Sequence, residues 1–137
     1  MSNGFQHMTD QISPEKISRA VRAYFLAIRA MDAEAFANTF AEDGTTFDPV
    51  GTPAITGREA IREFLTSICK NFKSVGLTEE SVFVADNGAA VKWTGRGTSA
   101  TGKEVRFEGI DVFEVNADGK IQTVRAYWNP AEMIGQL

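Results

Sequence analysis

Apolar side chains recur every three to four residues in the first part of the chain, which predicts amphipathic helices. Ser13 followed by Pro14 marks the start of the first helix, because serine caps helices and proline favours their first turn. The apolar face of this helix consists of Ile17, Val21, Tyr24, Phe25 and Ile28. Asp32 can cap a second, short helix over residues 33–40, with its two phenylalanines inward, and a Glu-Asp-Gly run then ends it.

A third helix is predicted to open at Thr56, because Thr56 and Glu59 have the spacing of a capping box. The helical pattern fades near Phe72. The apolar stripe of this helix consists of Ala60, Ile61, Phe64, Leu65 and Ile68. Before it, residues 45–47 favour a strand, and the Asp-Pro-Val-Gly run at 48–51 favours a turn.

The second half of the chain predicts strands over residues 77–85, 89–99, 104–115 and 120–128. Asn87-Gly88 is a strong hairpin signal. Helices followed by hairpin-linked strands predict an α+β fold, with the helices on one face of an antiparallel sheet. Three glycines within the strands suggest bends or bulges that curve the sheet: Gly95, Gly97 and Gly109. A curved sheet around a helix leaves an apolar pocket at its open end.

Asp111 stands out within the strand at 104–115. It shares the parity of four apolar residues, Val105, Phe107, Phe113 and Val115, so its carboxyl belongs to an apolar face. Burial without a partner favours the protonated form, which donates a hydrogen bond. The alternative is a carboxylate that reaches solvent at a bulge or pairs with an arginine such as Arg125.

The overall composition is that of one ordinary globular domain, with 43% hydrophobic and 23% charged residues in a chain of 137. We expect a single domain over residues 13–137, preceded at 1–12 by a disordered leader or N-terminal extension. The net charge of −4, without a basic cluster, argues against a nucleic-acid partner. No apolar run approaches the roughly 20 residues that span a bilayer, and no signal segment opens the chain. We therefore expect a cytoplasmic protein without membrane contact.

Cys69 and His7 are the single cysteine and the single histidine. Their scarcity argues against an intrachain disulfide, a cysteine or histidine metal site, and a histidine base. Two other residues could carry chemistry. Tyr24 lies on an apolar helix face, and this pattern alone favours a core aromatic with a satisfied hydroxyl. Asp48 precedes Pro49, which is also typical of a simple turn residue.

Several segments resemble the bacterial ketosteroid isomerases, in the same order along the chain. They are Ala-Tyr-Phe-Leu-Ala at 23–27, Phe-Asp-Pro-Val-Gly at 47–51, the run at 55–64, Gly-Ile-Asp-Val-Phe at 109–113 and the run at 118–128. The specific feature is the joint presence of Tyr24, Asp48 and Asp111 in the three functional positions of that family. The resemblance implies an NTF2-like (cystatin-like) cone, with N-terminal helices packed on a curved, mostly antiparallel sheet around an apolar pocket.

The resemblance also implies a reaction, in which a β,γ double bond moves into conjugation with a ketone without any cofactor. Asp48 would be the general base, and Tyr24 with a protonated Asp111 would donate hydrogen bonds to the carbonyl oxygen. Ketosteroid isomerases are the known example of a carboxylic acid held neutral by an apolar site, so that protonation state is here an implication of the resemblance. A steroid-like polycyclic ligand and a homodimer formed through the outer sheet face are implied in the same way.

This sequence departs from the family at two positions, where Phe40 and Leu65 replace tyrosines that often support the catalytic one. We expect four apolar residues to bind the substrate: Phe40, Leu65, Phe113 and Trp128. Two other functions stay open. One is a related enzyme such as a polyketide cyclase, a dehydratase or an epoxide hydrolase. The other is a non-catalytic module for small-molecule binding or dimerisation.

Overall fold

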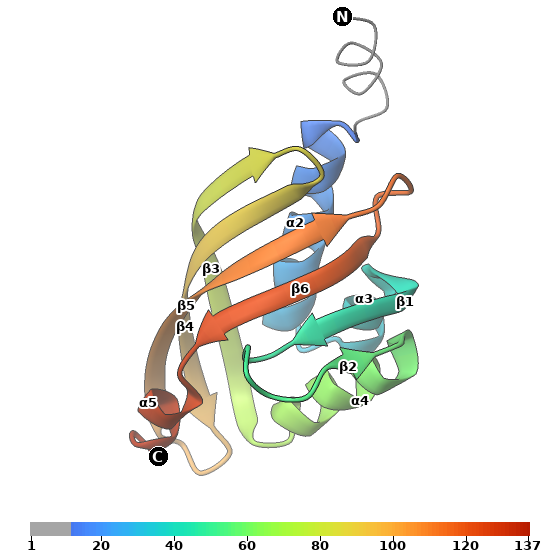
Figure 1. The fold of residues 1–137 in the computed structure, drawn as a ribbon. Coiled ribbons are helices and arrows are strands. Elements are labelled where there is room, and N and C mark those ends of the chain that lie inside the picture. The colour runs from blue at the N-terminus through green and yellow to red at the C-terminus, as the bar shows by residue number, and fades with distance from the viewer. Residues whose placement is uncertain (1–11) are drawn as a thin grey trace, which may run out of the picture.

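The computed structural model describes residues 12–137, in which helices cover the inner face of a curved sheet (Figure 1). The helices are α2 (Pro14–Arg29), α3 (Ala33–Asn38), α4 (Arg58–Cys69) and α5 (Pro130–Ile134). The strands are β1 (Phe40–Phe47), β2 (Ile55–Thr56), β3 (Phe72–Ala85), β4 (Gly88–Ser99), β5 (Glu104–Val115) and β6 (Ile121–Trp128). The predicted α+β arrangement is confirmed. The predicted leader lies outside the described residues, except for Ile12, and so does His7.

The first two helices begin where the sequence predicts. The Ser13 hydroxyl accepts the backbone N–H of Lys16 at 3.2 Å, and the Asp32 carboxylate accepts that of Ala35 at 3.0 Å. The end predicted for the second helix is wrong, because α3 stops at Asn38 and Phe40 begins β1. Phe40 pairs with Ile121 of β6, so strand pairing replaces a further helical turn. The Glu-Asp-Gly run, predicted to end the helix, lies within β1, where the register with β6 is irregular.

The capping box predicted for the third helix does not form. Thr56 belongs to β2, where its hydroxyl contacts the Thr45 hydroxyl at 3.1 Å. The N-cap of α4 is Gly57 instead, with a φ of 93° and no side-chain hydrogen bond to the helix. Thr56 therefore pairs with β1 as part of β2 and does not cap the helix, although the sequence pattern predicts that it does.

The six strands form one sheet in the order β2-β1-β6-β5-β4-β3. Only β1 and β6 are parallel neighbours, and the other pairs are antiparallel. The bulges predicted at the strand glycines are not found between β4 and β5, whose register is continuous. Gly95 and Gly109 instead leave room for rings. An added Cβ would lie 2.5 Å from the Phe107 ring at Gly95 and 2.7 Å from the Trp93 ring at Gly109.

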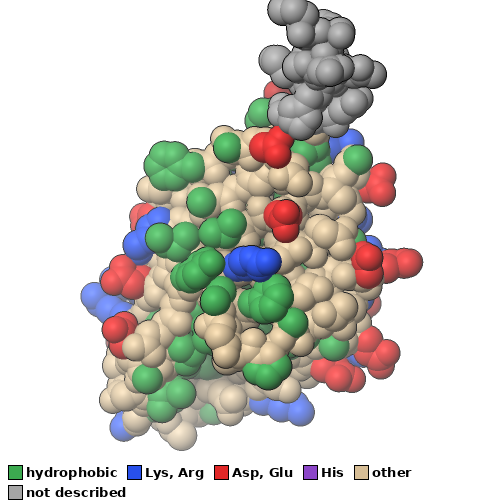
Figure 2. Space-filling model, in the orientation of Figure 1, with side chains coloured by type: hydrophobic (Ala, Val, Ile, Leu, Met, Phe, Trp, Pro, Cys, Tyr) green, Lys and Arg blue, Asp and Glu red, His purple; other side chains and the backbone are tan. Residues whose placement is uncertain are grey.

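The core fills the concave side of the sheet, where α2 packs against β3 (Figure 1). The opposite, outer face carries partly exposed apolar side chains, and Figure 2 shows hydrophobic groups gathered there around a basic side chain. Within residues 12–137, none of the helices is both long enough and apolar enough to cross a membrane.

Candidate active site

A cavity of about 240 Å³ lies between α2, α4, α5 and the inner face of the sheet. Tyr24, Asp48 and Asp111 all line it, although they come from α2, the end of β1 and the middle of β5. The remaining lining is mostly apolar and comprises Ile28, Phe36, Pro49, Phe64, Leu65, Ile68, Cys69, Asn71, Phe72, Val75, Leu77, Trp93, Phe107, Ala126, Trp128, Pro130 and Met133. Tyr24, Asp48 and Asp111 therefore converge on a mostly apolar chamber, in which Asn71 is a further polar side chain, as in many small-molecule sites.

Asp111 is 2% exposed and faces the cavity from β5. Its Oδ1 accepts the indole N–H of Trp93 at 2.9 Å. Burial, and then the nearby Asp48 carboxylate, raise the pKa of Asp111 to about 8, while the hydrogen bonds with Trp93 and Tyr24 act in the opposite direction. The carboxyl is therefore mostly protonated at neutral pH.

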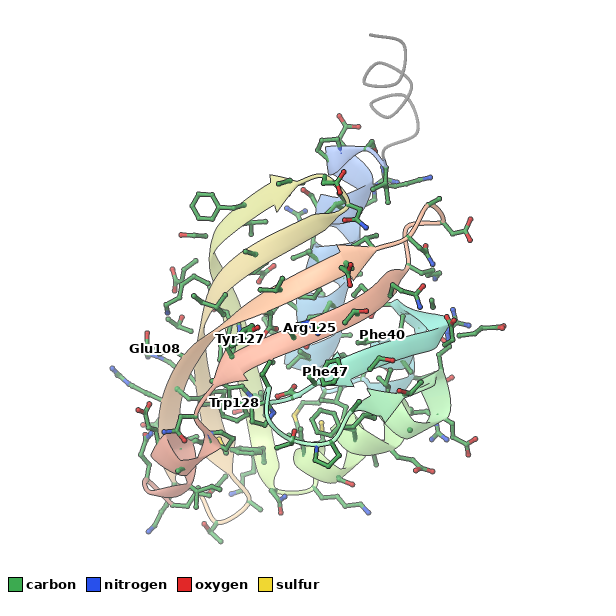
Figure 3. All side chains as sticks on the ribbon, in the orientation of Figure 1. Phe40, Phe47, Glu108, Arg125, Tyr127 and Trp128 are labelled. Atoms are coloured by element: carbon green, nitrogen blue, oxygen red, sulfur yellow. The ribbon has the colours of Figure 1, made fainter. Side chains whose placement is uncertain are left out.

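Arg125, the alternative partner of Asp111, does not pair with it in the structure. Arg125 lies opposite Val112 in the β5–β6 ladder, so it belongs to the outer face of the sheet. Its guanidinium carbon is 4.9 Å from the ring centroid of Phe47, and Figure 3 shows the two residues on the neighbouring strands β6 and β1.

Asp48 follows the last residue of β1 and is partly buried at the cavity. Its Oδ1 accepts the indole N–H of Trp128 at 2.7 Å, from the end of β6 (Figure 3). Burial raises the pKa of Asp48, and the hydrogen bond from Trp128 opposes that rise. A carboxylate with a raised pKa is a stronger base than an ordinary aspartate.

Tyr24 is 2% exposed, and its hydroxyl interacts with Asp111. Burial, followed by the charges of Asp111 and Asp48, raises the pKa of Tyr24 well above its ordinary value, so the hydroxyl keeps its proton. Phe40 and Phe113 pack against the Tyr24 ring with centroids 6.1 Å and 5.0 Å away.

The four predicted substrate-binding residues divide into two groups. Leu65 and Trp128 line the cavity. Phe40 and Phe113 are fully buried behind Tyr24 and are not among the lining residues, because their rings fill the core beneath the tyrosine.

Sequence reasoning missed five aromatic residues of the cavity wall: Phe36, Phe64, Phe72, Trp93 and Phe107. Trp93 shares its parity on β4 with the buried Val91, so the alternation along the strand placed it on the inner face. The alternation along one strand does not give the register between β4 and β5, so the contact between Trp93 and Asp111 could not be predicted from it. That register sets Trp93 opposite Gly109, two residues from Asp111.

Residues 21–124 match the SnoaL-like domain family, and the chain belongs to that family. The predicted NTF2-like fold is thereby confirmed. A putative polyketide cyclase from Xanthomonas campestris pv. campestris is similar in structure, with a TM-score of 0.79 and 26% identity over 89% of this chain and 96% of that one.

The resemblance to the ketosteroid isomerases is also confirmed. The Steroid Delta-isomerase of Nocardioides simplex is 31% identical over 119 residues, which span 87% of this chain and 94% of that protein. The epoxide hydrolase/cyclase-like enzyme SalBIII, with a role in pyran ring formation in the polyether salinomycin, is similar as well. Its TM-score is 0.76, with 26% identity over 86% of this chain and 94% of that one.

Proposed function

We propose that this protein is a cofactor-independent isomerase that moves a β,γ double bond into conjugation with a ketone on a steroid or a similar polycyclic molecule. The observation that carries the proposal is the environment of Asp111. Burial raises its pKa to about 8 on the wall of an apolar cavity that also contains a second carboxyl group, Asp48. One acid that stays protonated beside one that can act as a base suits proton transfer next to a carbonyl group.

In the proposed reaction, the Asp48 carboxylate removes a proton from the carbon between the ketone and the double bond. The electron pair moves onto the ketone oxygen and gives a dienolate. Asp111 and Tyr24 donate hydrogen bonds to that oxygen as its negative charge grows. Asp48 then returns the same proton to the far carbon of the former double bond, so no atom or electron is gained or lost.

The apolar wall supplies the remaining requirement, which is to hold a flat hydrophobic ligand and exclude water. Leu65, Phe107 and Trp128 present apolar surface from three different elements around the carboxyl groups. In a dry site, hydrogen bonds to a developing oxyanion are stronger than in water.

An absorbance assay with a β,γ-unsaturated ketosteroid tests the proposal directly, because the conjugated product absorbs in the ultraviolet. We expect turnover by the wild-type protein. Asp48→Asn should lose the base and most of the rate, and Asp111→Leu should lose an oxyanion donor and about 10²–10³-fold in kcat. Asp43→Asn is the matched control, because Asp43 is exposed and lies outside the cavity lining.

Turnover that survives unchanged in both active-site variants would contradict the proposed roles. Tight binding of a phenolic steroid without turnover would indicate a binding module or another reaction. Among the described residues, no arginine lines the cavity, which weighs against the arginine-containing site of epoxide hydrolases.

We further propose that a second copy of the chain packs on the outer face of the sheet. Ile110, Val112 and Tyr127 are 44%, 37% and 49% exposed there, and Ile110 pairs directly with Tyr127 across β5 and β6. Figure 2 shows this apolar surface from the front. Sedimentation should report a dimer for the wild type and a monomer for Val112→Lys, while Thr66→Lys on the exposed side of α4 should leave the dimer intact.

A further inference from the structure

We propose that Trp93 is a positioning residue for Asp111, because its indole N–H fixes which carboxyl oxygen carries the proton. The inference rests on the proposed function, since it assigns Asp111 the role of donor to the substrate carbonyl. It concerns a side chain that contacts the acid and not the reacting atoms.

The contact with Trp93 determines which of the two carboxyl oxygens of Asp111 carries the proton. The Trp93 Nε1 lies 2.9 Å from Oδ1 of Asp111, and both residues are at most 3% exposed. An indole N–H can only donate, so Oδ1 must accept. The carbonyl oxygen of a neutral acid is a stronger acceptor than its hydroxyl oxygen, so the contact favours Oδ1 as the carbonyl oxygen. The acid proton therefore resides on Oδ2, which is left free to donate.

Tyr24 cannot determine which oxygen of Asp111 carries the proton. Its hydroxyl also hydrogen-bonds with Asp111, but a hydroxyl can donate or accept. It therefore adapts to whichever oxygen carries the proton. Of these two partners of Asp111, only Trp93 distinguishes the two oxygens.

The indole is itself held in place by packing. Gly109 lies opposite Trp93 in the β4–β5 ladder, and a Cβ at Gly109 would come within 2.7 Å of Cζ2 of the indole. The rings of Phe107 and Trp128 meet it edge to face, with centroids 5.8 Å and 6.1 Å away. Because the ring fills a fitted space between a glycine and two aromatic rings, its N–H has one available direction.

The test compares Trp93→Phe with Leu65→Ala, a control that alters the cavity wall from α4 and leaves the rings around the indole in place. Carbon-13 NMR of the Asp111 carboxyl, recorded against pH without ligand, should show a higher pKa in Trp93→Phe, since the lost hydrogen bond lowered it. Kinetics on the ketosteroid should show kcat about tenfold lower with KM little changed, and a matching upward shift in the alkaline limb of the pH profile. Leu65→Ala should raise KM and leave the pKa of Asp111 in place.

An unchanged Asp111 titration in folded Trp93→Phe, or a change in KM alone, would overturn the inference while the proposed function stood. Far-ultraviolet circular dichroism establishes that the variant is folded. A wild-type protein without turnover would instead reject the proposed function. The NMR titration would then still decide whether Trp93 governs the protonation of Asp111.

Discussion

At the scale of single residues, two carboxyl groups in one cavity differ in what surrounds them. Asp111 is nearly inaccessible and lies beside the charge of Asp48, so both burial and like charge favour its protonated form. Asp48 keeps partial exposure at the end of a strand. Both accept a tryptophan N–H, so the difference between them comes from burial and charge and not from the type of hydrogen-bond donor.

This difference predicts a bell-shaped dependence of kcat/KM on pH. Activity requires Asp48 ionised and Asp111 protonated, so the rate should rise through the pKa of Asp48 and fall near pH 8. The two limbs report the coupled pair of groups in the free enzyme. The profile is measured with the ketosteroid assay between pH 4 and 10, and a rate that keeps rising through pH 9 would contradict a protonated Asp111.

The same shift predicts how stability depends on pH. The pKa of Asp111 is raised in the folded state to about 8 from an ordinary value of 3.8, so the unfolded chain releases this proton first as pH rises. Stability is therefore lost between about pH 4 and pH 8. Asp111→Asn, which stays neutral, should match the wild type at pH 4 and exceed it by a few kcal/mol at pH 9.

Urea unfolding at the two pH values measures this effect. Asp43→Asn, on the exposed surface, should show no comparable gain at pH 9. An equal gain for Asp111→Asn at both pH values would mean that the stabilisation does not come from the ionisation of Asp111.

A site residue could be predicted where its position follows from the pattern of its own strand, and not where it depends on contacts with another strand. The parity of Asp111 among apolar neighbours is local, so the alternation along β5 was enough to predict its burial. The contact from Trp93 depends on the register of two strands, which no local pattern encodes. Phe40 was assigned to the cavity, yet it packs behind Tyr24, because which side of a ring faces a cavity is decided by three-dimensional packing.

At the scale of elements, the strand glycines are explained by the rings beside them. Gly109 lies between Trp93 on β4 and Trp128 on β6, so the close approach of three strands depends on its missing side chain. The sequence alone marks Gly109 as unusual within a strand. It does not distinguish a glycine that bends the strand from one that allows neighbouring side chains to approach closely, because both give the same residue in the pattern.

Gly109→Ala should therefore disturb both carboxyl partners at once. The new Cβ would meet the Trp128 Cβ, the Trp93 ring and the Tyr127 carbonyl, each at 2.7 Å, and relief of that overlap should cost about 1–3 kcal/mol of stability. Gly76→Ala is the matched control, because its new Cβ would have an ordinary contact at 3.6 Å. Urea unfolding and tryptophan fluorescence measure the two effects, and equal stability of both variants would contradict this account.

Helix starts were predictable where a side chain of the same segment caps them. The caps at Ser13 and Asp32 need only a side chain and the next turn of backbone, so they can be recognised locally. The end of α3 and the start of α4 are fixed by pairing with β6 and β1, which lie elsewhere in the chain. The long-range ladder prevails over the local preference in both places.

At the scale of the whole molecule, the C-terminal segment forms part of the cavity wall. Pro130 and Met133 of α5 contribute to its lining. The segment is tied to β5 by Gln136, whose amide accepts the N–H of Arg106 at 2.8 Å and donates to its carbonyl at 2.6 Å. The cavity volume of about 240 Å³ is below the roughly 300–1,000 Å³ of pockets for drug-sized ligands.

A four-ring ligand should therefore have to displace α5, whereas a two-ring ligand should not. Gln136→Ala removes two of the hydrogen bonds that hold the segment, so displacement becomes easier by about the value of two ordinary hydrogen bonds. We expect the dissociation constant of a phenolic steroid to fall several-fold, up to about tenfold, and that of a naphthol to stay unchanged. Gln122→Ala is the control, because Gln122 bonds to Asp43 away from the cavity. Titration calorimetry of both ligands with both variants measures the difference. Equal changes for the two ligands, or weaker steroid binding, would show that α5 does not limit ligand length.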